Sequence, residues 1–86
     1  MPYIRPEQRP SLDEALNDVR PRDEGELNYC ITRLCHRYLQ SRPDGVRYAH
    51  LNAVVGALEC SKLELYRRVV GPYEDQKIAE NGDVRL

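Results

Sequence analysis

The stretch NAVVGALEC, residues 52–60, is typical of the middle of an α-helix, although it contains a glycine. Its small residues recur at positions i, i+3, i+4 and i+7, which places them on one face of a helix. They are Ala53, Gly56, Ala57 and Cys60. A glycine in a helix interior destabilises the helix by up to about 1 kcal/mol, so its presence indicates a close approach by another backbone. The stretch therefore predicts a helix with a tightly packed neighbour on this face.

Apolar residues extend this helix in both directions, from Val46 or Tyr48 to Val70. They form two stripes, one of Leu51, Val55, Leu58, Leu65 and Val69, and one of Leu63, Tyr66 and Val70. A single short helix cannot cover so wide an arc. We therefore expect another helix of the chain on the first stripe and a second copy of the chain on the remaining surface, most simply across a two-fold axis. The predicted interface of this homo-oligomer consists of Ala53, Gly56, Ala57, Cys60 and Leu63.

A second helix, over about residues 26–40, is the expected neighbour within the chain. Its apolar residues follow a helical period, while Arg33 and Arg37 lie on its other side. The segment SRPDG, residues 41–45, is a strong turn signal between this helix and the long one. The two helices are therefore predicted to form an antiparallel hairpin.

The N-terminal side of the hairpin is expected to be partly extended. Residues 1–10 contain three prolines and are predicted to form an extended arm. Ser11–Glu14 has the pattern of a capping box, which opens a short helix that Pro21 ends. Arg20–Gly25 then forms a charged linker to the second helix.

On the C-terminal side, Gly71–Pro72 is expected to break the long helix. A short helix over Tyr73–Glu80 follows, stopped by Asn81–Gly82, and residues 83–86 form a tail. The expected fold class is all-α: a small helical bundle built on the antiparallel helical hairpin with short flanking helices. Residues 1–86 are expected to form a single small domain.

The composition narrows the possible partners and the compartment. A net charge of -1 gives no general attraction to nucleic acid or to an anionic membrane. No apolar run is long enough to span a bilayer, and the first ten residues lack the apolar core of a signal peptide, so a cytoplasmic protein is expected. The odd number of cysteines, three, argues against a disulfide framework, and paired zinc-ligand spacing is absent.

Polar residues recur on the long helix at a seven-residue step, at Asn52, Glu59 and Tyr66. In one interpretation they only fix the register of a helical bundle. In the other they face a pocket for an anionic, nucleotide-like ligand, with a phosphate on arginine and a ring stacked on Tyr66. The second interpretation assigns ligand binding to Asn52, Glu59, Lys62, Tyr66, Arg67 and Arg68.

No catalytic group can be assigned from the sequence. His36 follows Cys35 directly, so on a helix the two side chains point about 100° apart, and a glycine-rich phosphate loop is absent. All-helical nucleoside triphosphate pyrophosphatases that resemble the MazG group use an E-x-x-E helix followed by E-x-x-D. The nearest matches are Asp23-x-x-Glu26 and Glu80-x-x-Asp83, and neither places two carboxylates on one helical face. No catalytic residue, metal site or cofactor is therefore predicted.

Two segments carry a resemblance to known sequences: GELNYCITRL (25–34) and YAHLNAVVGALECSKLELYRRVVGPYEDQKIAENGDV (48–84). They resemble a family of short proteins from bacteriophages, prophages and environmental viral sequences, most specifically in LELYRRVVGPYED and ENGDV. The family carries no assigned activity or catalytic residue. The resemblance implies a viral accessory protein that acts in the cytoplasm of an infected bacterium. Small helical phage proteins often antagonise host defence, and some hold nucleotide signals in pockets between subunits.

Three functions remain open from the sequence. The first is a non-enzymatic, oligomeric binding protein that antagonises a bacterial host defence by sequestering a nucleotide-like immune signal. The second is a MazG-like, metal-dependent nucleoside triphosphate pyrophosphatase. The third is an adaptor or inhibitor that binds a host defence protein and no small ligand.

Overall fold

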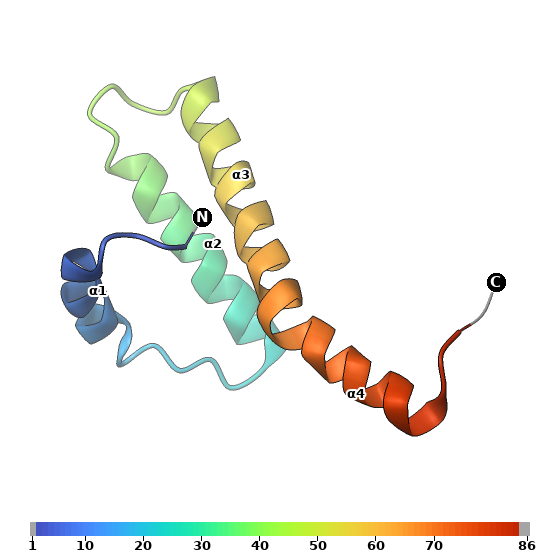
Figure 1. Ribbon diagram of the computed structural model, residues 1–86. Helices are drawn as coiled ribbons and strands as arrows, with labels where there is room; N and C mark the ends of the chain where they lie inside the picture. Colours follow the sequence, from blue (N-terminus) through green and yellow to red (C-terminus); the bar gives the residue numbers. More distant parts are fainter. Residues whose placement is uncertain (1, 85–86) are drawn as a thin grey trace. The chain divides into compact units, whose positions relative to one another are not determined.

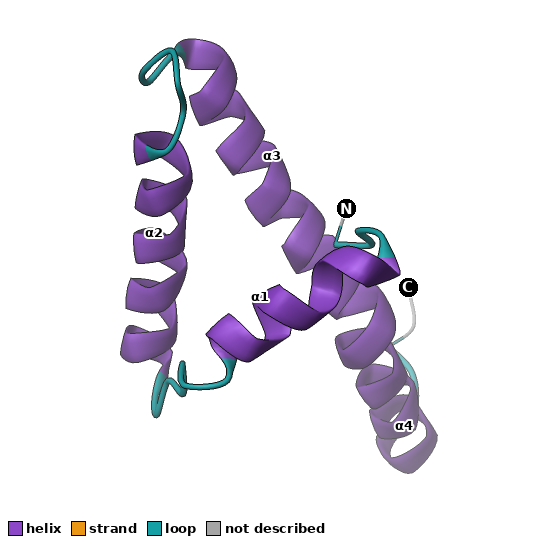
Figure 2. Ribbon diagram, turned by 90° about the vertical axis from the view of Figure 1, so that its left-hand side faces the viewer, coloured by secondary structure: helices purple, strands orange, loops and turns teal. Residues whose placement is uncertain are grey.

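A computed structural model describes residues 2–84, which contain helices and loops and no strand (Figures 1 and 2). In chain order the elements are the 3-10 helix η1 (Pro6–Gln8), α1 (Arg9–Leu16), α2 (Glu24–Gln40), α3 (Tyr48–Leu65), the π-helical segment η2 (Tyr66–Val70) and α4 (Gly71–Asn81). The predicted all-α class is confirmed. The chain divides into two units: one is Tyr3–Val55, and the other contains Pro2 and the residues from Gly56 onward. A single domain over residues 1–86 stays a prediction.

The N-terminal arm is helical in its second half. The extended arm expected over residues 1–10 is wrong beyond residue 5, because η1 starts at Pro6 and α1 includes Pro10. Proline is favoured in the first turn of a helix, where no backbone N–H is needed and its fixed φ already suits the helix. Ser11 therefore lies inside α1, and the capping box predicted at Ser11–Glu14 is not the start of this helix.

Helix α2 confirms the helix predicted over residues 26–40 and begins two residues earlier. Asp23 is the residue that caps it: the backbone N–H of Glu26 donates to Asp23 Oδ1 at 2.8 Å. This bond satisfies one of the backbone donors that a helix start leaves unpaired. The charged linker is correspondingly shorter than Arg20–Gly25.

The loop after α2 contains the predicted turn. Gly45 has a φ of 79°, and its N–H donates to the carbonyl of Arg42 at 3.2 Å. Asp44 then joins the loop to α3, because its carboxylate lies 3.0 Å from Arg47 Nε and 3.0 Å from His50 Nε2. The chain reverses direction at this loop (Figure 1). Antiparallel packing of the two long helices, and a bundle built on it, stay predictions.

The expected break at Gly71–Pro72 is wrong, because helical structure continues from α3 through η2 into α4. In an α-helix the ring of Pro72 would clash with the carbonyl four residues earlier. The π-helical segment avoids this conflict by widening the turn: the N–H of Gly71 donates to the carbonyl of Tyr66, five residues back. A Cβ on Gly71 would lie 3.1 Å from that carbonyl oxygen, so a glycine suits this position.

The predicted helix stop at Asn81–Gly82 is confirmed. Helix α4 ends at Asn81, and Gly82 has a φ of 87° and donates its N–H to the carbonyl of Ile78 at 2.8 Å. Residues 83 and 84 follow the helix without regular structure. The remainder of the predicted tail, residues 85–86, lies outside the described residues.

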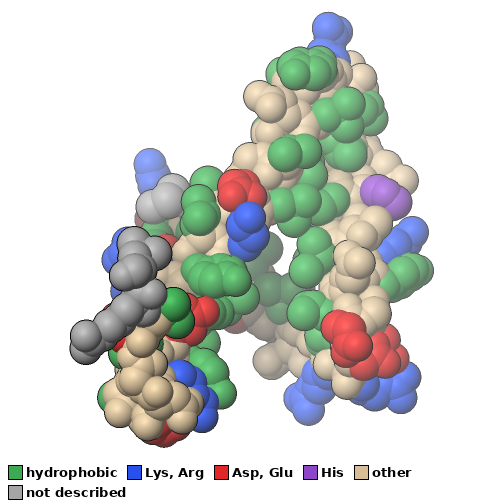
Figure 3. Space-filling view, turned by 90° about the vertical axis from the view of Figure 1, so that its right-hand side faces the viewer, with side chains coloured by type: hydrophobic (Ala, Val, Ile, Leu, Met, Phe, Trp, Pro, Cys, Tyr) green, Lys and Arg blue, Asp and Glu red, His purple; other side chains and the backbone are tan. Residues whose placement is uncertain are grey.

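No residue in the described part of the chain is buried. Large apolar side chains stay exposed on each of the α-helices, for example Leu12 on α1, Leu27 on α2, Val55 on α3 and Ile78 on α4. Hydrophobic side chains accordingly reach the surface in the space-filling view (Figure 3). The described residues therefore form helices without an enclosed hydrophobic core.

Candidate functional site

The structure separates the predicted ligand-binding residues into groups. Asn52 belongs to the first unit, whereas Glu59 and Lys62 lie on the part of α3 that belongs to the second. Lys62 Nζ lies 3.2 Å from Glu59 Oε1, and both side chains are more than half exposed. The charge of Lys62 is thus offset by Glu59, which weakens its role as a cation beside Tyr66. Such an exposed ion pair contributes little to stability.

The other three predicted ligand residues lie together in η2. Tyr66, Arg67 and Arg68 are consecutive in this segment, and Tyr66 is 54% exposed. Neither arginine forms an ion pair with another described residue. Single π-helical turns are frequent at functional sites, although this one also has a structural cause in Pro72. A ring and two available guanidinium groups are suited to an anionic aromatic ligand.

At Gly56, the small-residue face of α3 has no close neighbour among the described residues. A Cβ added at Gly56 would meet no heavy atom within 4 Å in the part of the chain that the structure describes. Cys60 is half-buried, whereas Leu63 is 56% exposed. Ala57 lies in the same unit, and Ala53 belongs to the other one. Residues 2–84 therefore show no close backbone approach at Gly56 of the kind that the glycine predicts.

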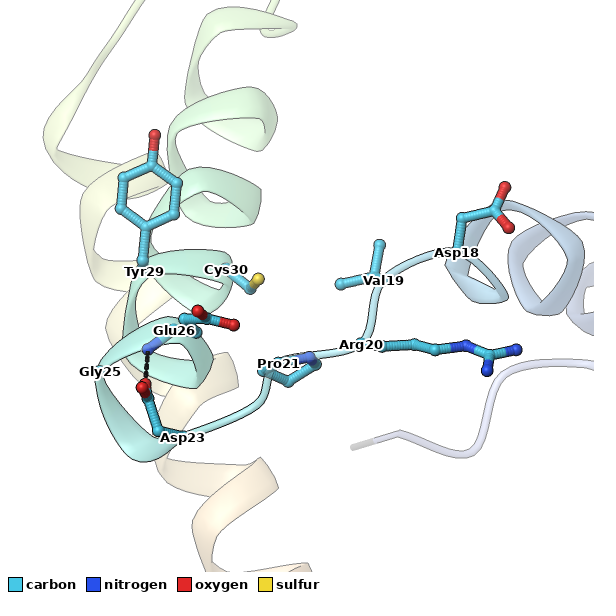
Figure 4. A pocket seen from close by; sticks show the side chains of 9 residues that line it. All are labelled: Asp18, Val19, Arg20, Pro21, Asp23, Gly25, Glu26, Tyr29 and Cys30. Atoms are coloured by element: carbon cyan, nitrogen blue, oxygen red, sulfur yellow. Dashed lines mark hydrogen bonds between the residues drawn. The ribbon is translucent and has the colours of Figure 1, made fainter.

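Sequence reasoning missed a hollow of about 580 Å³ between the linker after α1 and the start of α2 (Figure 4). Val19 on the linker and Cys30 on α2 point toward one another across it (Figure 4). It is lined by Asp18, Val19, Arg20, Pro21, Asp23, Gly25, Glu26, Tyr29 and Cys30. The first helix was expected to continue as far as Pro21, but α1 ends at Leu16, so Val19 lies on the linker.

A second hollow, of about 260 Å³, adjoins the first further along α2 and shares Val19, Tyr29 and Cys30 with it. The residues added there are Arg33, Leu34 and Arg37. The two hollows together form a groove along α2, from Asp23 to Arg37, which we name the α2 groove. The four-residue spacing of Tyr29, Arg33 and Arg37 is visible in the sequence, but only the position of Val19 turns that helix face into a groove.

The two ends of the α2 groove differ in charge. Three carboxylates, those of Asp18, Asp23 and Glu26, and one arginine, Arg20, line the end near the start of α2, while only arginines are charged at the other end. The side chain of Arg22 binds Glu26, with Nη2 2.9 Å from Oε2, and its backbone N–H donates to the same carboxylate at 3.0 Å. These two interactions lower the pKa of Glu26, the side-chain interaction having the larger effect, so the carboxylate stays ionised.

Arg33 and Arg37 at the opposite end form no ion pair with any other described residue. Tyr29 beside them is 66% exposed. This end therefore offers positive charge and a ring next to the apolar side chains of Val19 and Leu34, and it is suited to a partner that is both apolar and acidic.

The carboxylates considered for pyrophosphatase chemistry have other roles in the structure. Asp23 caps α2, Glu26 binds Arg22, and Glu80 accepts a hydrogen bond from Lys77 Nζ at 3.2 Å. Across residues 2–84, histidine, cysteine and carboxylate side chains do not gather in a group that could hold a metal ion. In the same residues, none of the helices has the length and apolar character needed to cross a bilayer.

Comparison with known proteins gives a family and no activity. No curated protein and no solved structure matches the chain significantly. One family model, described as a domain of unknown function (DUF6899), matches residues 1–84. Because this match covers almost the whole chain, the protein belongs to the DUF6899 family.

Proposed function

We propose that this protein is a non-enzymatic binding module that completes its hydrophobic core by associating with further copies of itself. The observation that supports the proposal is the lack of any buried residue in the described part of the chain, together with exposed apolar side chains on every α-helix. Burial of apolar surface is the main favourable contribution to folding, so helices in this condition need a partner. Apolar patches of this extent usually mark an interface.

The exposed area agrees with this proposal in magnitude. The chain exposes 7974 Å². A folded monomer of its mass, 10.0 kDa, is expected to expose about 5,200 Å². The difference, about 2,700 Å², exceeds the roughly 800 Å² that each partner contributes to an interface of standard size. It is comparable with what each chain buries in an extensive obligate oligomer.

The small-residue face of α3 is the proposed centre of this association. The glycine indicates a close backbone approach, and no heavy atom of the described residues lies within 4 Å of a Cβ added at Gly56. In a two-fold assembly the same face of each copy meets its counterpart, so Gly56, Ala57 and Cys60 would lie near the axis with Leu63 beside them. Contact between two such faces brings the backbones close without displacing any side chain of the chain itself.

The ligand in this proposal is a nucleotide-like anion at η2. Arg67 and Arg68 provide charge-assisted hydrogen bonds for phosphate, and Tyr66 provides a ring for stacking. The resemblance to phage proteins adds a biological setting: a protein that antagonises a host defence in the cytoplasm of an infected bacterium by sequestering an immune signal. An adaptor that binds a host defence protein is the second candidate, because the same exposed apolar surface suits a foreign partner.

Sedimentation equilibrium over a wide concentration range is the decisive experiment for self-association. A homo-oligomer should dissociate on dilution, and its thermal midpoint should fall with concentration, because unfolding and dissociation are linked. A folded monomer at every concentration would overturn the proposal. Native mass spectrometry of protein purified from defence-active cells should then detect a retained small molecule. Magnesium-dependent turnover of a nucleotide panel would instead support the pyrophosphatase, and capture of a host defence protein without a small ligand would support the adaptor.

A further inference from the structure

We infer that the α2 groove is the docking site for α1 of a second copy, so that two copies exchange their first helices reciprocally. This inference rests on the proposed self-association and names the segments that meet in it. The small-residue face of α3 lies outside the groove, so the two contacts are separate parts of one assembly.

The first argument is the apolar match. Leu12 and Leu16 lie four residues apart on α1, on one face, and are 52% and 46% exposed. The groove presents Val19, Cys30 and Leu34 to receive them. At 1.5 Å per residue, the eight residues of α1 extend about 12 Å, which fits along the part of α2 that lines the groove.

The second argument is charge. Arg33 and Arg37 at one end of the groove form no ion pair with other described residues, and neither does Asp13 on α1. Asp13 lies beside the face that carries Leu12 and Leu16, about 80° around the helix from its middle, so seating the leucines brings this carboxylate toward the arginines. Oppositely charged groups around an apolar contact fix its register and suppress wrong partners.

The third argument is direction. Arg5 and Arg9 lie before α1 and in its first turn, with Glu7 between them, and at the opposite end of the groove the carboxylates of Asp18, Asp23 and Glu26 outnumber Arg20. Opposite charges meet at both ends of the groove only when α1 runs parallel to α2. A chain that folds α1 back over its own α2 across a short linker makes the pair antiparallel, which sends Arg9 toward the arginine end.

The linker also holds α1 away from its own groove. The N–H of Val19 donates to the carbonyl of Leu16 at 3.0 Å, and Arg20 Nε donates to the carbonyl of Asn17 at 3.3 Å. These bonds form a turn directly after α1, and Val19 occupies the wall of the groove. Closure of α1 onto its own α2 would have to open this turn, whereas a second copy leaves it intact.

Two charge-reversed variants test the exchange. The groove variant is Arg33→Glu with Arg37→Glu, and the helix variant is Asp13→Arg. Each alone should self-associate at least about tenfold more weakly than the wild type, because like charges then face each other. An equimolar mixture should associate as the wild type does, since each groove meets a helix of opposite charge on the other chain. Circular dichroism checks that both variants remain helical.

A control variant, Asp75→Arg, makes the same change in charge as the helix variant, but on α4, and should neither weaken self-association nor restore association with the groove variant. Restoration only when all three groove and helix substitutions are in one chain, and not in the mixture, would show that α1 docks on its own chain and overturn the exchange. If both charge-reversed variants self-associate as strongly as the wild type, the exchange of first helices is overturned too, while the proposed oligomer remains. A monomeric wild type would instead remove the proposed function itself.

Discussion

Replacement of Gly56 by leucine tests whether the small-residue face of α3 is a contact between copies. Within the described chain, a side chain at this position meets no heavy atom within 4 Å of its Cβ. Leucine also has a more favourable helix propensity than glycine, by roughly 0.8 kcal/mol in a helix interior. In an isolated chain, Gly56→Leu should therefore stabilise the helix.

In the proposed oligomer the same substitution is unfavourable. Overpacking of a tight contact costs about 1–3 kcal/mol, and a two-fold axis brings the substitution into the contact from both copies. A dimer would lose about 2–6 kcal/mol of association free energy. At about 1.4 kcal/mol for each factor of ten, the dissociation constant should rise by roughly 30-fold to more than about 10,000-fold.

Sedimentation equilibrium measures this change directly, and circular dichroism melts at several concentrations report the accompanying change in stability. Lys62→Leu is the control, because residue 62 lies at least about 120° around the helix from Gly56, Ala57 and Cys60. The ion pair that this control removes, between Lys62 Nζ and Glu59 Oε1 at 3.2 Å, is exposed and contributes little to stability. The reasoning is refuted if Gly56→Leu associates as tightly as the wild type and melts at a higher temperature at every concentration.

Three further predictions concern local structure. Asp23→Ala should remove the cap of α2 and reduce the free energy of unfolding by about 1 kcal/mol, measured by urea titration; an unchanged midpoint would contradict the role of this bond. Arg22→Gln should remove the larger of the two interactions that lower the pKa of Glu26, the one with the Arg22 side chain. Ionised Glu26 stabilises the wild type above its ordinary pKa, and this contribution is lost as the pH falls through the lowered value, so the difference in thermal midpoint between wild type and variant should shrink in acid. A difference independent of pH would show that Glu26 is not its source. Pro72→Ala should let Tyr66–Val70 return to an α-helix, seen in backbone chemical shifts; a retained π-helical pattern would point to a cause other than proline.

The parts of the fold that the sequence predicted correctly depend on local chemistry. The spacing of its apolar residues predicts helix α2, and the turn that holds Gly45 at positive φ follows the end of this helix. Both signals lie within a few residues of the structure that they determine. Gly82 ends α4 for the same reason. The effect of proline on the helices was predicted wrongly in two places. At Pro6 and Pro10 it lies in first turns that tolerate it, and at Pro72 a widened turn accommodates it.

The candidate sites depend on geometry that no short stretch determines. The α2 groove exists because the linker brings Val19 beside Cys30, which a helical period alone does not predict. The pairing of Lys62 with Glu59 was equally open in the sequence, since a lysine on a helix can reach partners three or four residues away in either direction. The small-residue face was identified from the spacing of Ala53, Gly56, Ala57 and Cys60, but spacing alone does not determine what packs against such a face; a second copy is the proposed partner.

Ligand binding at η2 and self-association are physically linked if both proposals hold. A single exposed helix face gives a ligand contacts on one side only, whereas binding pockets normally bury about 70–90% of a small ligand. Tyr66, Arg67 and Arg68 therefore become a pocket when a second copy supplies the opposite wall. A ligand bound between copies stabilises the assembly by mass action, so it should tighten association at the same time as it is sequestered. Arg67→Ala would then abolish this ligand-induced stabilisation and leave the ligand-free oligomer unchanged, while Gly56→Leu would weaken both. Equal ligand affinity in monomer and oligomer would show instead that η2 binds its ligand without help from a second chain.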